Sequence, residues 1–348
     1  MEKQKTFILC TRCYTFNQSD YIIDAMNGFV MQKTSFPFVC VIVDDASTDE
    51  TPSIIRNYII DHFDFHHSDA YEKETNYASI FYAPHKENRN CYFAVVLLKE
   101  NHQSQKKSKF PYLREWRDTA KYNALCEGDD YWIDPNKLQK QVDYLESHPN
   151  VSFLFTARYV DDERRNIRIE QKYRIRNYTT NDILSGFNPG LQNICYKTEV
   201  QTDQEKYPTV NGDRILPYLA SMMGEIHCIN DITAVYRVTG KGVSTSIQDD
   251  EWFLHAAKDL YMFHQSVENN NKKLFCIGMT RYVGHYLKSY PFKQSVSLLP
   301  NLYKSIHGIN KDITFLDVIY IFCLMIKNKI LKKLDLGDVK TRIIKVEL

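Results

Sequence analysis

The fold of this chain is decided around one segment, Cys126-Glu127-Gly128-Asp129-Asp130-Tyr131-Trp132, which places three carboxylates within four residues. It follows the apolar run 122–126 and precedes a helix-like segment at 135–147. Because clustered carboxylates repel each other, a fold rarely gathers them at a strand end without a cation or ligand to offset the cost. Mg²⁺ and Mn²⁺ take oxygen ligands and often keep substrate phosphates in the same shell. The segment therefore favours a metal–diphosphate site, although taken alone a solvated acidic turn is the safer interpretation.

The composition is that of a globular protein. Of 348 residues, 43% are hydrophobic and 25% are charged, which fits one large domain with an appendage or two domains. The formal net charge is +1, so composition gives no reason to expect nucleic acid as a partner. Nine cysteines without a disulfide framework argue for a reducing compartment. The first residues do not resemble a signal peptide, and we expect a cytoplasmic protein.

Strand-like and helix-like segments alternate along the first half of the chain. The expected strands are apolar runs at 6–13, 38–43, 79–83, 92–98 and 122–126. Helices are expected after Ser19, as a capping residue, and from Pro52, in a first turn. Such alternation predicts a mostly parallel sheet covered on both faces, with ligands beyond the carboxyl ends of the strands. Polar clusters fall at three of these ends, at 14–17, Asp44-Asp45 and 127–130, and predict a nucleotide-like site.

The next part of the chain predicts a mixture of strands and helices. Residues 151–160 are expected to form a strand, and 226–238 one or two strands. The charged stretch 161–176 is expected to be a loop-rich excursion. Asp213 is well placed to cap a helix over 215–223, because a short carboxylate accepts from the first free amides of a helix.

From about Asp249 the pattern becomes helical and loses its strands. We therefore expect a first domain at 1–248 and a helical region at 249–348. Nine unbroken apolar residues at 318–326 precede four lysines, Lys327, Lys329, Lys332 and Lys333. A spanning helix needs about 20 apolar residues, so this run is too short. A helix lying on an anionic membrane surface and a buried helix with a basic end explain these residues equally well.

In their order, these motifs resemble family 2 glycosyltransferases of the GT-A fold, and most closely bacterial enzymes that build surface polysaccharides. Tyr14-Thr15-Phe16-Asn17 resembles the opening T-Y-N segment of the family, and 43–51 (VDDASTDET) matches its V-D-D-x-S-x-D-x-T turn. Residues 125–132 resemble its D-x-D region, and Asn211-Gly212-Asp213 its acceptor-side segment. The ordered set covers about residues 6–245 and is more specific than any single motif.

The resemblance implies a site for a nucleotide-diphosphate sugar. On the nucleoside side, Asp45 would contact a uracil-type base, and Tyr14 and Phe16 would line the base pocket. Asn101 or His102 is a weaker candidate for the same pocket. The implied donor is a UDP- or dTDP-sugar.

The resemblance also implies roles at the phosphates and the acceptor. Asp129 would bind the ribose, and Asp130 the divalent metal, Mn²⁺ or Mg²⁺, that bridges the diphosphate. Asp213 would be the general base for the acceptor hydroxyl. Arg237 would hold a phosphate, although an arginine at a strand end is more often in an ordinary ion pair. The longer side chain of Glu127 keeps it out of the expected metal shell.

The implied reaction is an inverting, metal-dependent transfer of a sugar to a hydroxyl of a glycan or lipid-linked glycan, in capsule, O-antigen or exopolysaccharide assembly. A cation stabilises the leaving diphosphate, and one carboxylate base with in-line attack inverts the anomeric carbon. Many relatives carry a His shortly after the Tyr-Arg of the late strand, where this chain has Thr239, so the resemblance does not extend to a third metal ligand or a diphosphate contact at that position. The expected location is the cytoplasm, at the inner face of the membrane if the basic C-terminal helix contacts lipid.

Two other classes stay open. Phosphoryl and nucleotidyl transferases also use Asp-Asp turns after strands, but a phosphatase of that type would carry its acidic pair at the first strand, where Tyr14-Thr15 stand. No P-loop sequence occurs. A sugar-nucleotide-binding protein without turnover is the other class, and the presence of both Asp130 and Asp213 speaks against it. Alone, Asp44-Asp45 is equally well an acidic turn and Asp213 is better explained as a cap, so only the ordered combination supports the assignment.

Overall fold

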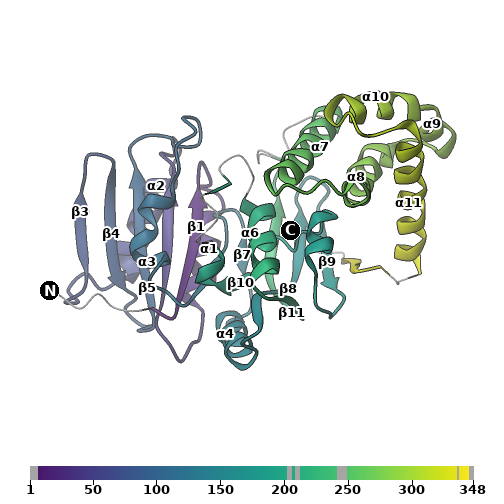
Figure 1. Cartoon of the computed structure of the whole chain (residues 1–348). Helices are drawn as coiled ribbons and strands as arrows, with labels where there is room; N and C mark the ends of the chain where they lie inside the picture. The colour runs from purple at the N-terminus through teal and green to yellow at the C-terminus, as the bar shows by residue number, and fades with distance from the viewer. Residues whose placement is uncertain (1–6, 202–205, 208–211, 241–248, 335–336, 345–348) are drawn as a thin grey trace.

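The structure, a computed structural model, describes residues 7–201, 206–207, 212–240, 249–334 and 337–344. Its centre is one mixed sheet with helices on its faces (Figure 1). The strands are β1 Leu9–Thr15, β2 Phe38–Asp44, β3 Tyr71–Glu74, β4 Ala78–Pro84, β5 Cys91–Leu98, β6 Tyr122–Leu125, β7 Tyr131–Trp132, β8 Val151–Asp162, β9 Ile167–Tyr173, β10 Ile194–Lys197, β11 Glu225–Val238 and β12 Val339–Ile344. The α-helices are α1 Ile22–Val30, α2 Thr51–His62, α3 Arg114–Arg117, α4 Lys137–Ser147, α5 Thr180–Leu184, α6 Gly212–Met223, α7 Asp249–Ser266, α8 Lys272–Tyr286, α9 Phe292–Ser297, α10 Leu299–Ile309 and α11 Phe315–Lys333.

The first half of the chain forms the parallel part of the sheet, as the alternating pattern predicts. The strands lie in the order β6-β1-β2-β5, each parallel to its neighbour, and β4 and β3 extend the edge antiparallel. All residues of β2 and β5 are buried, because α1 and α2 cover one face of this part and α3 lies over the other. Strands buried on both faces are expected to read as continuous apolar runs, and these do.

The second half of the sheet differs from the expectation at 161–176. This stretch is not a loop-rich excursion, because its first two residues end β8 and residues 167–173 form β9, which pairs antiparallel with the end of β8. Four of its seven residues, IRIEQKY, are charged or polar, and only Tyr173 is buried, while the other six are half-buried. A strand whose side chains are largely half-buried can carry as many charges as a loop, so its composition does not distinguish it from a loop.

The prediction that strands end at Asp249 is also wrong. Strand β12 follows the C-terminal helices in the chain and pairs antiparallel with β9 at the edge of the sheet. It is a short edge strand in which Lys340 and Arg342 interrupt the apolar residues. Charged side chains are common on edge strands because they discourage pairing with other chains, and they also hide the strand from a hydrophobicity pattern.

Helices α7 to α11 form a block at one end of the sheet (Figure 1). One hydrophobic cluster joins this block to the sheet, since it contains Phe155 of β8 and Ile226 of β11 together with Leu260 and Met279 of the helices. The division into 1–248 and 249–348 therefore stays a prediction, and the two parts share a core. Among the described residues, no helix is both long and apolar enough to cross a membrane.

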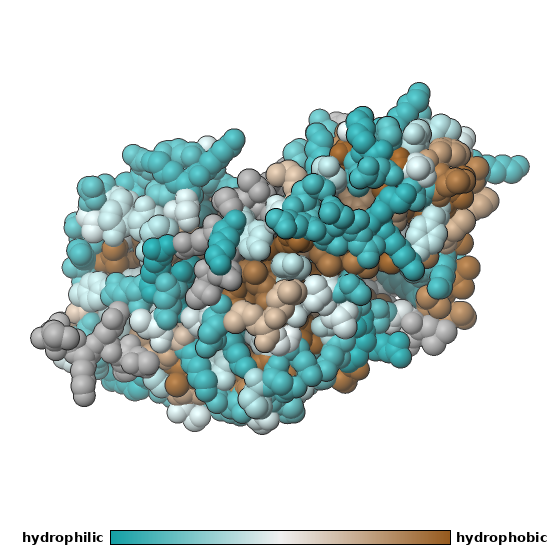
Figure 2. Space-filling model, in the orientation of Figure 1, coloured by the Kyte–Doolittle hydropathy of each residue, from teal (hydrophilic) through white to brown (hydrophobic). Residues whose placement is uncertain are grey.

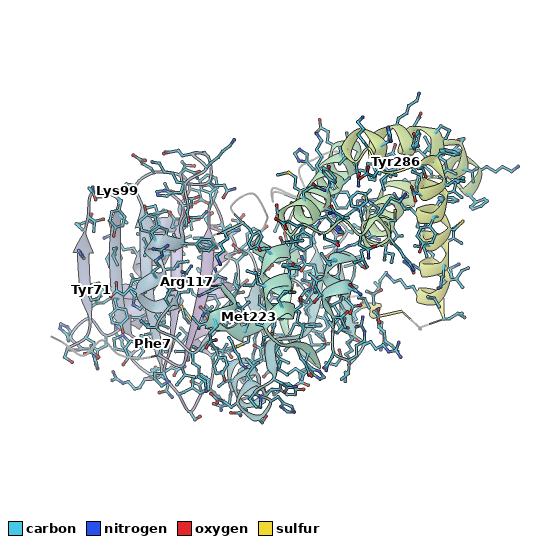
Figure 3. The ribbon with its side chains drawn as sticks, viewed as in Figure 1. Phe7, Tyr71, Lys99, Arg117, Met223 and Tyr286 are labelled. Atoms are coloured by element: carbon cyan, nitrogen blue, oxygen red, sulfur yellow. The ribbon has the colours of Figure 1, made fainter. Side chains whose placement is uncertain are left out.

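The parallel strands end along one edge of the sheet. In Figure 3, Lys99, which directly follows β5, lies at the upper edge, and Phe7, two residues before β1, lies at the lower edge. The three clusters predicted from the sequence follow β1, β2 and β6, so all of them lie at the upper edge. The fold thus brings them together, as expected for an open parallel sheet.

Gly28 allows α1 to pack directly against β7. A Cβ at this position would lie 2.9 Å from the backbone nitrogen of Trp132 and 3.1 Å from its carbonyl oxygen. We expect Gly28→Ala to lower the free energy of unfolding by about 1–3 kcal/mol, because backbone atoms of a strand cannot move aside cheaply. The matched change Gly308→Ala, in α10, meets nothing within 4 Å. It should raise the free energy of unfolding by roughly 0.5–1 kcal/mol, because alanine favours a helix.

Urea unfolding of both variants measures these effects. Equal stabilisation by the two substitutions would contradict the close packing of α1 on β7.

Candidate active site

The turns after β1 and β2 are bonded to each other. Asn17, with a left-handed φ of 52°, donates its backbone N–H to Ser47 Oγ (2.9 Å), and its Oδ1 accepts from the N–H of Thr48 (2.8 Å). The N–H of Ser19 donates to Asp49 Oδ2 (3.1 Å). Ser19 was expected to cap α1, but the residue at that position is Tyr21, without a side-chain bond. The side chains of this region are used to join two turns rather than to cap a helix.

Asp44 and Asp45 have different tasks. Asp44 accepts from the N–H (3.0 Å) and the hydroxyl (2.5 Å) of Ser47, as an acidic turn residue does. Asp45 is buried and points to the segment 101–109, where its Oδ1 accepts from the N–H of His102 (2.7 Å). Its Oδ2 accepts from the N–H of Gln103 (3.0 Å) and from Lys109 Nζ (3.0 Å).

These contacts set the charge of Asp45. Burial raises the pKa of the Asp45 carboxyl, but the bonds from His102, Lys109 and Gln103 outweigh burial and bring the pKa below its usual value. Asp45 is therefore an ionised carboxylate, and it fixes the segment 101–109 over the strand ends. The same segment carries His102, whose two ring nitrogens bond to the Glu100 carbonyl (2.9 Å) and the Tyr112 hydroxyl (2.8 Å).

The two aromatic residues after β1 lie differently. Lys109 Nζ lies 5.2 Å from the centre of the Tyr14 ring, so one lysine joins Tyr14 to Asp45. Burial raises the pKa of Tyr14 to about 12. Phe16 is 45% exposed, which leaves an aromatic ring at the surface beside these groups. The structure thus gathers Tyr14 and Asp45 closely and leaves Phe16 at the rim.

The carboxylate turn after β6 passes very close to β1. The N–H of Gly128 donates to the Tyr14 carbonyl (3.0 Å), and a Cβ on Gly128 would lie 2.8 Å from Thr15 Oγ1 and 2.4 Å from Gln18 Oε1. Only glycine fits this approach. Within the described residues, Thr15 Oγ1 and Gln18 Oε1 are buried oxygens without a hydrogen-bond partner. Two such acceptors beside the acidic turn indicate a place where a donor or cation is bound.

Burial raises the pKa values of all three carboxylates in this turn. Burial, together with the charge of Asp129, raises the pKa of Glu127 to about 7, although Lys109 and Arg12 act in the opposite direction. Burial also raises the pKa of Asp129, and that of Asp130 well above the usual range. Asp130 Oδ1 accepts from the N–H of Arg237 (2.9 Å). Added positive charge would stabilise the ionised form of each group.

Arg237 closes the turn but is already paired. Its guanidinium donates to the carbonyl of Asp129 (3.2 Å), forms an ion pair with Asp24, and lies 3.7 Å from Glu163. It also stacks on the Tyr131 ring, 4.3 Å from the ring centre. The ion-pair role that the sequence offered as the commoner alternative is present, and phosphate binding by Arg237 stays a prediction.

Asp213 lies in α6, a separate element from the turn 127–130. It is in the first turn of the helix, whose first residue is Gly212, so the expectation that Asp213 caps the helix is wrong. Asn211 lies outside the described residues. Asn188 Nδ2 donates to Asp213 Oδ2 (3.0 Å), and burial raises the pKa of Asp213. The negative charge of Asp213 also contributes to the raised pKa of Glu127, which places the two carboxylates in one electrostatic environment.

The sequence did not point to Arg158, whose charge acts on Asp130, or to Asn188, which donates to Asp213. Gly190, with φ +88°, accommodates the guanidinium of Arg158 so closely that a Cβ would overlap it. Arg158 also lies 5.2 Å from the centre of the Tyr236 ring, and its charge lowers the pKa of Asp130 in part. Asn188 links this loop to Asp213, since its Oδ1 also accepts from the N–H of Gly190 (2.8 Å). The Asn188-Pro189-Gly190 turn was the available signal.

The side chains around the turn 127–130 supply only part of the ligands that a divalent cation needs. The described residues contain no group of three His, Cys, Asp or Glu side chains close enough to hold a metal by themselves. Asp129 and Asp130 offer hard carboxylate oxygens, and the unpaired Thr15 and Gln18 oxygens lie against the same turn. Magnesium-type ions are typically held by one or two carboxylates together with substrate phosphates and water. The site therefore fits a cation that arrives with a diphosphate.

The chain is similar to known glycosyltransferases in part of its sequence and in its fold. The family model for glycosyl transferase family 2 matches residues 14–77, which include the turns after β1 and β2. Among solved structures, the chain is similar to residues 1–349 of S. aureus TarS in complex with UDP-GlcNAc, with a TM-score of 0.51 and 13% identity over 92% of this chain and 88% of that one. It is also similar to the mannosyltransferase PcManGT from Pyrobaculum calidifontis in complex with GDP-Man and Mn²⁺, with a TM-score of 0.50 and 14% identity over 93% and 88% of the two chains.

The match to the family 2 glycosyltransferases thus covers the N-terminal part of the chain, and the two solved glycosyltransferases share the fold of nearly the whole chain, which is the GT-A fold. A curated relative, the uncharacterized protein Rv1520 of Mycobacterium tuberculosis, is 29% identical over 238 residues, which cover 68% of this chain. The aligned part spans 60% of the length of that relative.

The raised pKa of Glu127 predicts a pH dependence of stability. Between its ordinary pKa of 4.5 and about 7, the folded chain binds a proton that the unfolded chain has released. The free energy of unfolding should therefore fall as the pH rises through this window, with this residue contributing up to about 1.4 kcal/mol per pH unit. Glu127→Gln should flatten the slope in urea unfolding between pH 5 and pH 7 with EDTA present.

The exposed carboxylate Glu72 of β3 gives the matched control, Glu72→Gln, which should leave the slope unchanged. An unaltered slope in Glu127→Gln would mean that this carboxyl ionises normally.

Proposed function

We propose that this protein transfers a sugar from a nucleotide-diphosphate sugar to an acceptor hydroxyl. The observation that carries the proposal is the arrangement at one edge of the sheet, where Asp45 and the turn 127–130 follow neighbouring parallel strands and the charge of Asp213 acts on Glu127 of that turn. The family match supports sugar transfer, and the two similar proteins were solved in complex with UDP-GlcNAc and with GDP-Man.

On the donor side, the proposal assigns the nucleoside to the pocket beside β1 and β2. Tyr14 and Phe16 would line the pocket of the base. Asp45 would accept a hydrogen bond from the base, or it would hold the segment 101–109, which includes His102, against the base. Asp129 would bind the ribose. A uracil-type base fits a carboxylate acceptor, so a UDP- or dTDP-sugar is the proposed donor.

On the diphosphate side, Asp130 would hold a Mn²⁺ or Mg²⁺ ion. Such an ion, when bound, neutralises the charge that develops on the leaving diphosphate. The chain also contributes cations of its own. Arg237 donates its N–H to Asp130, the charge of Arg158 acts on the same carboxyl, and both arginines would help to orient the phosphates. The Mn²⁺ in the PcManGT complex supports a divalent cation.

On the acceptor side, Asp213 would remove the proton of the attacking hydroxyl. Burial raises its pKa, which makes the carboxylate a better base, and the bond from Asn188 fixes its direction. Attack from this side, opposite the leaving diphosphate, inverts the anomeric carbon without a covalent intermediate. The proposed acceptor is a glycan or a lipid-linked glycan of a surface polysaccharide.

Donor binding tests the proposal and the role of Asp130 together. We expect a UDP- or dTDP-sugar with Mn²⁺ to raise the thermal unfolding temperature, because a ligand that binds only the folded state stabilises it. Asp130→Ala should remove the part of this shift that depends on Mn²⁺. The control Asp61→Ala, an exposed residue of α2, should behave like the wild type. If no nucleotide or nucleotide sugar shifts the unfolding temperature, the proposal is wrong.

Asp213→Asn separates transfer from donor binding. The amide keeps the size of the side chain but cannot accept the proton, so transfer should fall by about 10²–10⁴-fold while donor affinity stays nearly unchanged. Product formation and calorimetric donor titration measure the two quantities. Parallel loss of both would assign Asp213 a structural role, and full donor binding by a wild type without product would favour a binding protein without turnover.

A further inference from the structure

Helix α11 has apolar side chains on two faces. Its inner face packs against the neighbouring helices through Val318, Ile321, Phe322 and Met325, which are all buried. Its outer face carries exposed residues spaced at intervals of four and three, namely Leu316, Tyr320, Cys323, Lys327 and Ile330, and Leu334 directly after the helix continues this spacing. Leu316 is 75% exposed. The sequence left open whether this helix is buried or lies at a surface. In the structure one face of α11 is buried and the other is exposed.

The outer face continues onto α9. Phe292 of α9 is 67% exposed, and its ring centre lies 6.1 Å from that of Phe322, so it borders α11. We name the exposed apolar residues of both helices, together with Leu334 directly after α11, the α9–α11 face: Phe292, Val296, Phe315, Leu316, Ile319, Tyr320, Ile330 and Leu334. Figure 2 shows hydrophobic residues gathered along this edge of the molecule, over α9 and α11. Contiguous exposed apolar groups on a soluble protein generally mark an interaction surface.

The charge around this face has one dominant sign. Residues 288–334 contain eight lysines and two aspartates, a formal net charge of +6, whereas the whole chain carries +1. Asp317 is already engaged, since it accepts from Thr314 and pairs with Lys272 (3.1 Å). Lys293 lies on α9, and Lys327, Lys329, Lys332 and Lys333 lie on the last part of α11. The partner of the face must therefore combine apolar surface with negative charge.

We propose that the α9–α11 face binds the surface of an anionic lipid bilayer. Leucine, isoleucine and aromatic side chains insert at the boundary between head groups and acyl chains, and the lysines contact lipid phosphates, which is the usual arrangement of an interfacial helix. A second copy of the chain fits less well, because it would bring another +6 segment against this one. The proposal goes beyond sugar transfer and does not depend on it. A transferase held in this way would meet acceptors carried on lipids.

Vesicle flotation tests the proposal with the full chain. Wild-type protein should float with vesicles of phosphatidylcholine and phosphatidylglycerol, should not float with phosphatidylcholine alone, and should be released by high salt. Lys329→Gln with Lys332→Gln should weaken binding by at least about tenfold, since each lysine near an anionic surface contributes about 1 kcal/mol. Lys33→Gln with Lys73→Gln removes the same charge from other exposed positions and should have no such effect.

The apolar part has its own pair of variants. Leu316→Gln should reduce flotation severalfold, whereas Ile60→Gln, at a 55% exposed position of α2, should not. Thermal unfolding confirms that each variant folds, and the donor-induced shift of the unfolding temperature should be unchanged in all four. This readout separates failure of the membrane proposal from failure of the proposed function.

Two results would overturn the proposal. One is equal binding of wild type to neutral and anionic vesicles, or to neither. The other is a concentration-dependent dimer in sedimentation velocity that Leu316→Gln dissociates, which would assign the face to a second copy.

Discussion

The buried carboxylate of Asp45 is the interaction on which the candidate site depends. Strands β1, β2 and β6 fix only where the chain leaves the sheet, and the segment 101–109 has little regular structure of its own. Asp45 holds it through two backbone amides and the Lys109 ammonium. Because the acceptor is a buried, ionised carboxylate, these bonds are stronger than those of an exposed loop, and they fix one side of the site.

The opposite side of the site is defined by negative charge that the chain only partly balances. The pKa values of Glu127, Asp129, Asp130 and Asp213 are all raised, chiefly by burial. The cationic side chains nearby are partly engaged elsewhere, since Lys109 pairs with Asp45 and Arg237 with Asp24. The arrangement is costly for an empty protein and favourable for one that binds a cation together with a diphosphate. This is a physical reason why a fold keeps such a turn.

The parts of the fold that could be predicted from the sequence are those with a strong local signal. The parallel strands are continuous apolar runs, and Pro52 occupies the first turn of α2 as expected. Strands β9 and β12 were missed because their charged residues resemble a loop until a neighbouring strand pairs with them. Ser19 and Asp213 were both expected to be caps, and neither is. A capping residue type is recognisable in the sequence, but the backbone geometry that makes it a cap is not.

By itself, the sequence determined the family resemblance, the order of the parallel strands in the first half of the chain and the residues from which a site would be built, because apolar runs and the short motifs at their ends carry that information. Only the tertiary structure decided what those residues do to one another. It paired Asp45 with Lys109, brought Arg158 and Asn188 to two of the carboxylates, and gave α11 an apolar outer face as well as an apolar inner one. These features arise from contacts between segments tens to hundreds of residues apart, for which a linear pattern contains no signal.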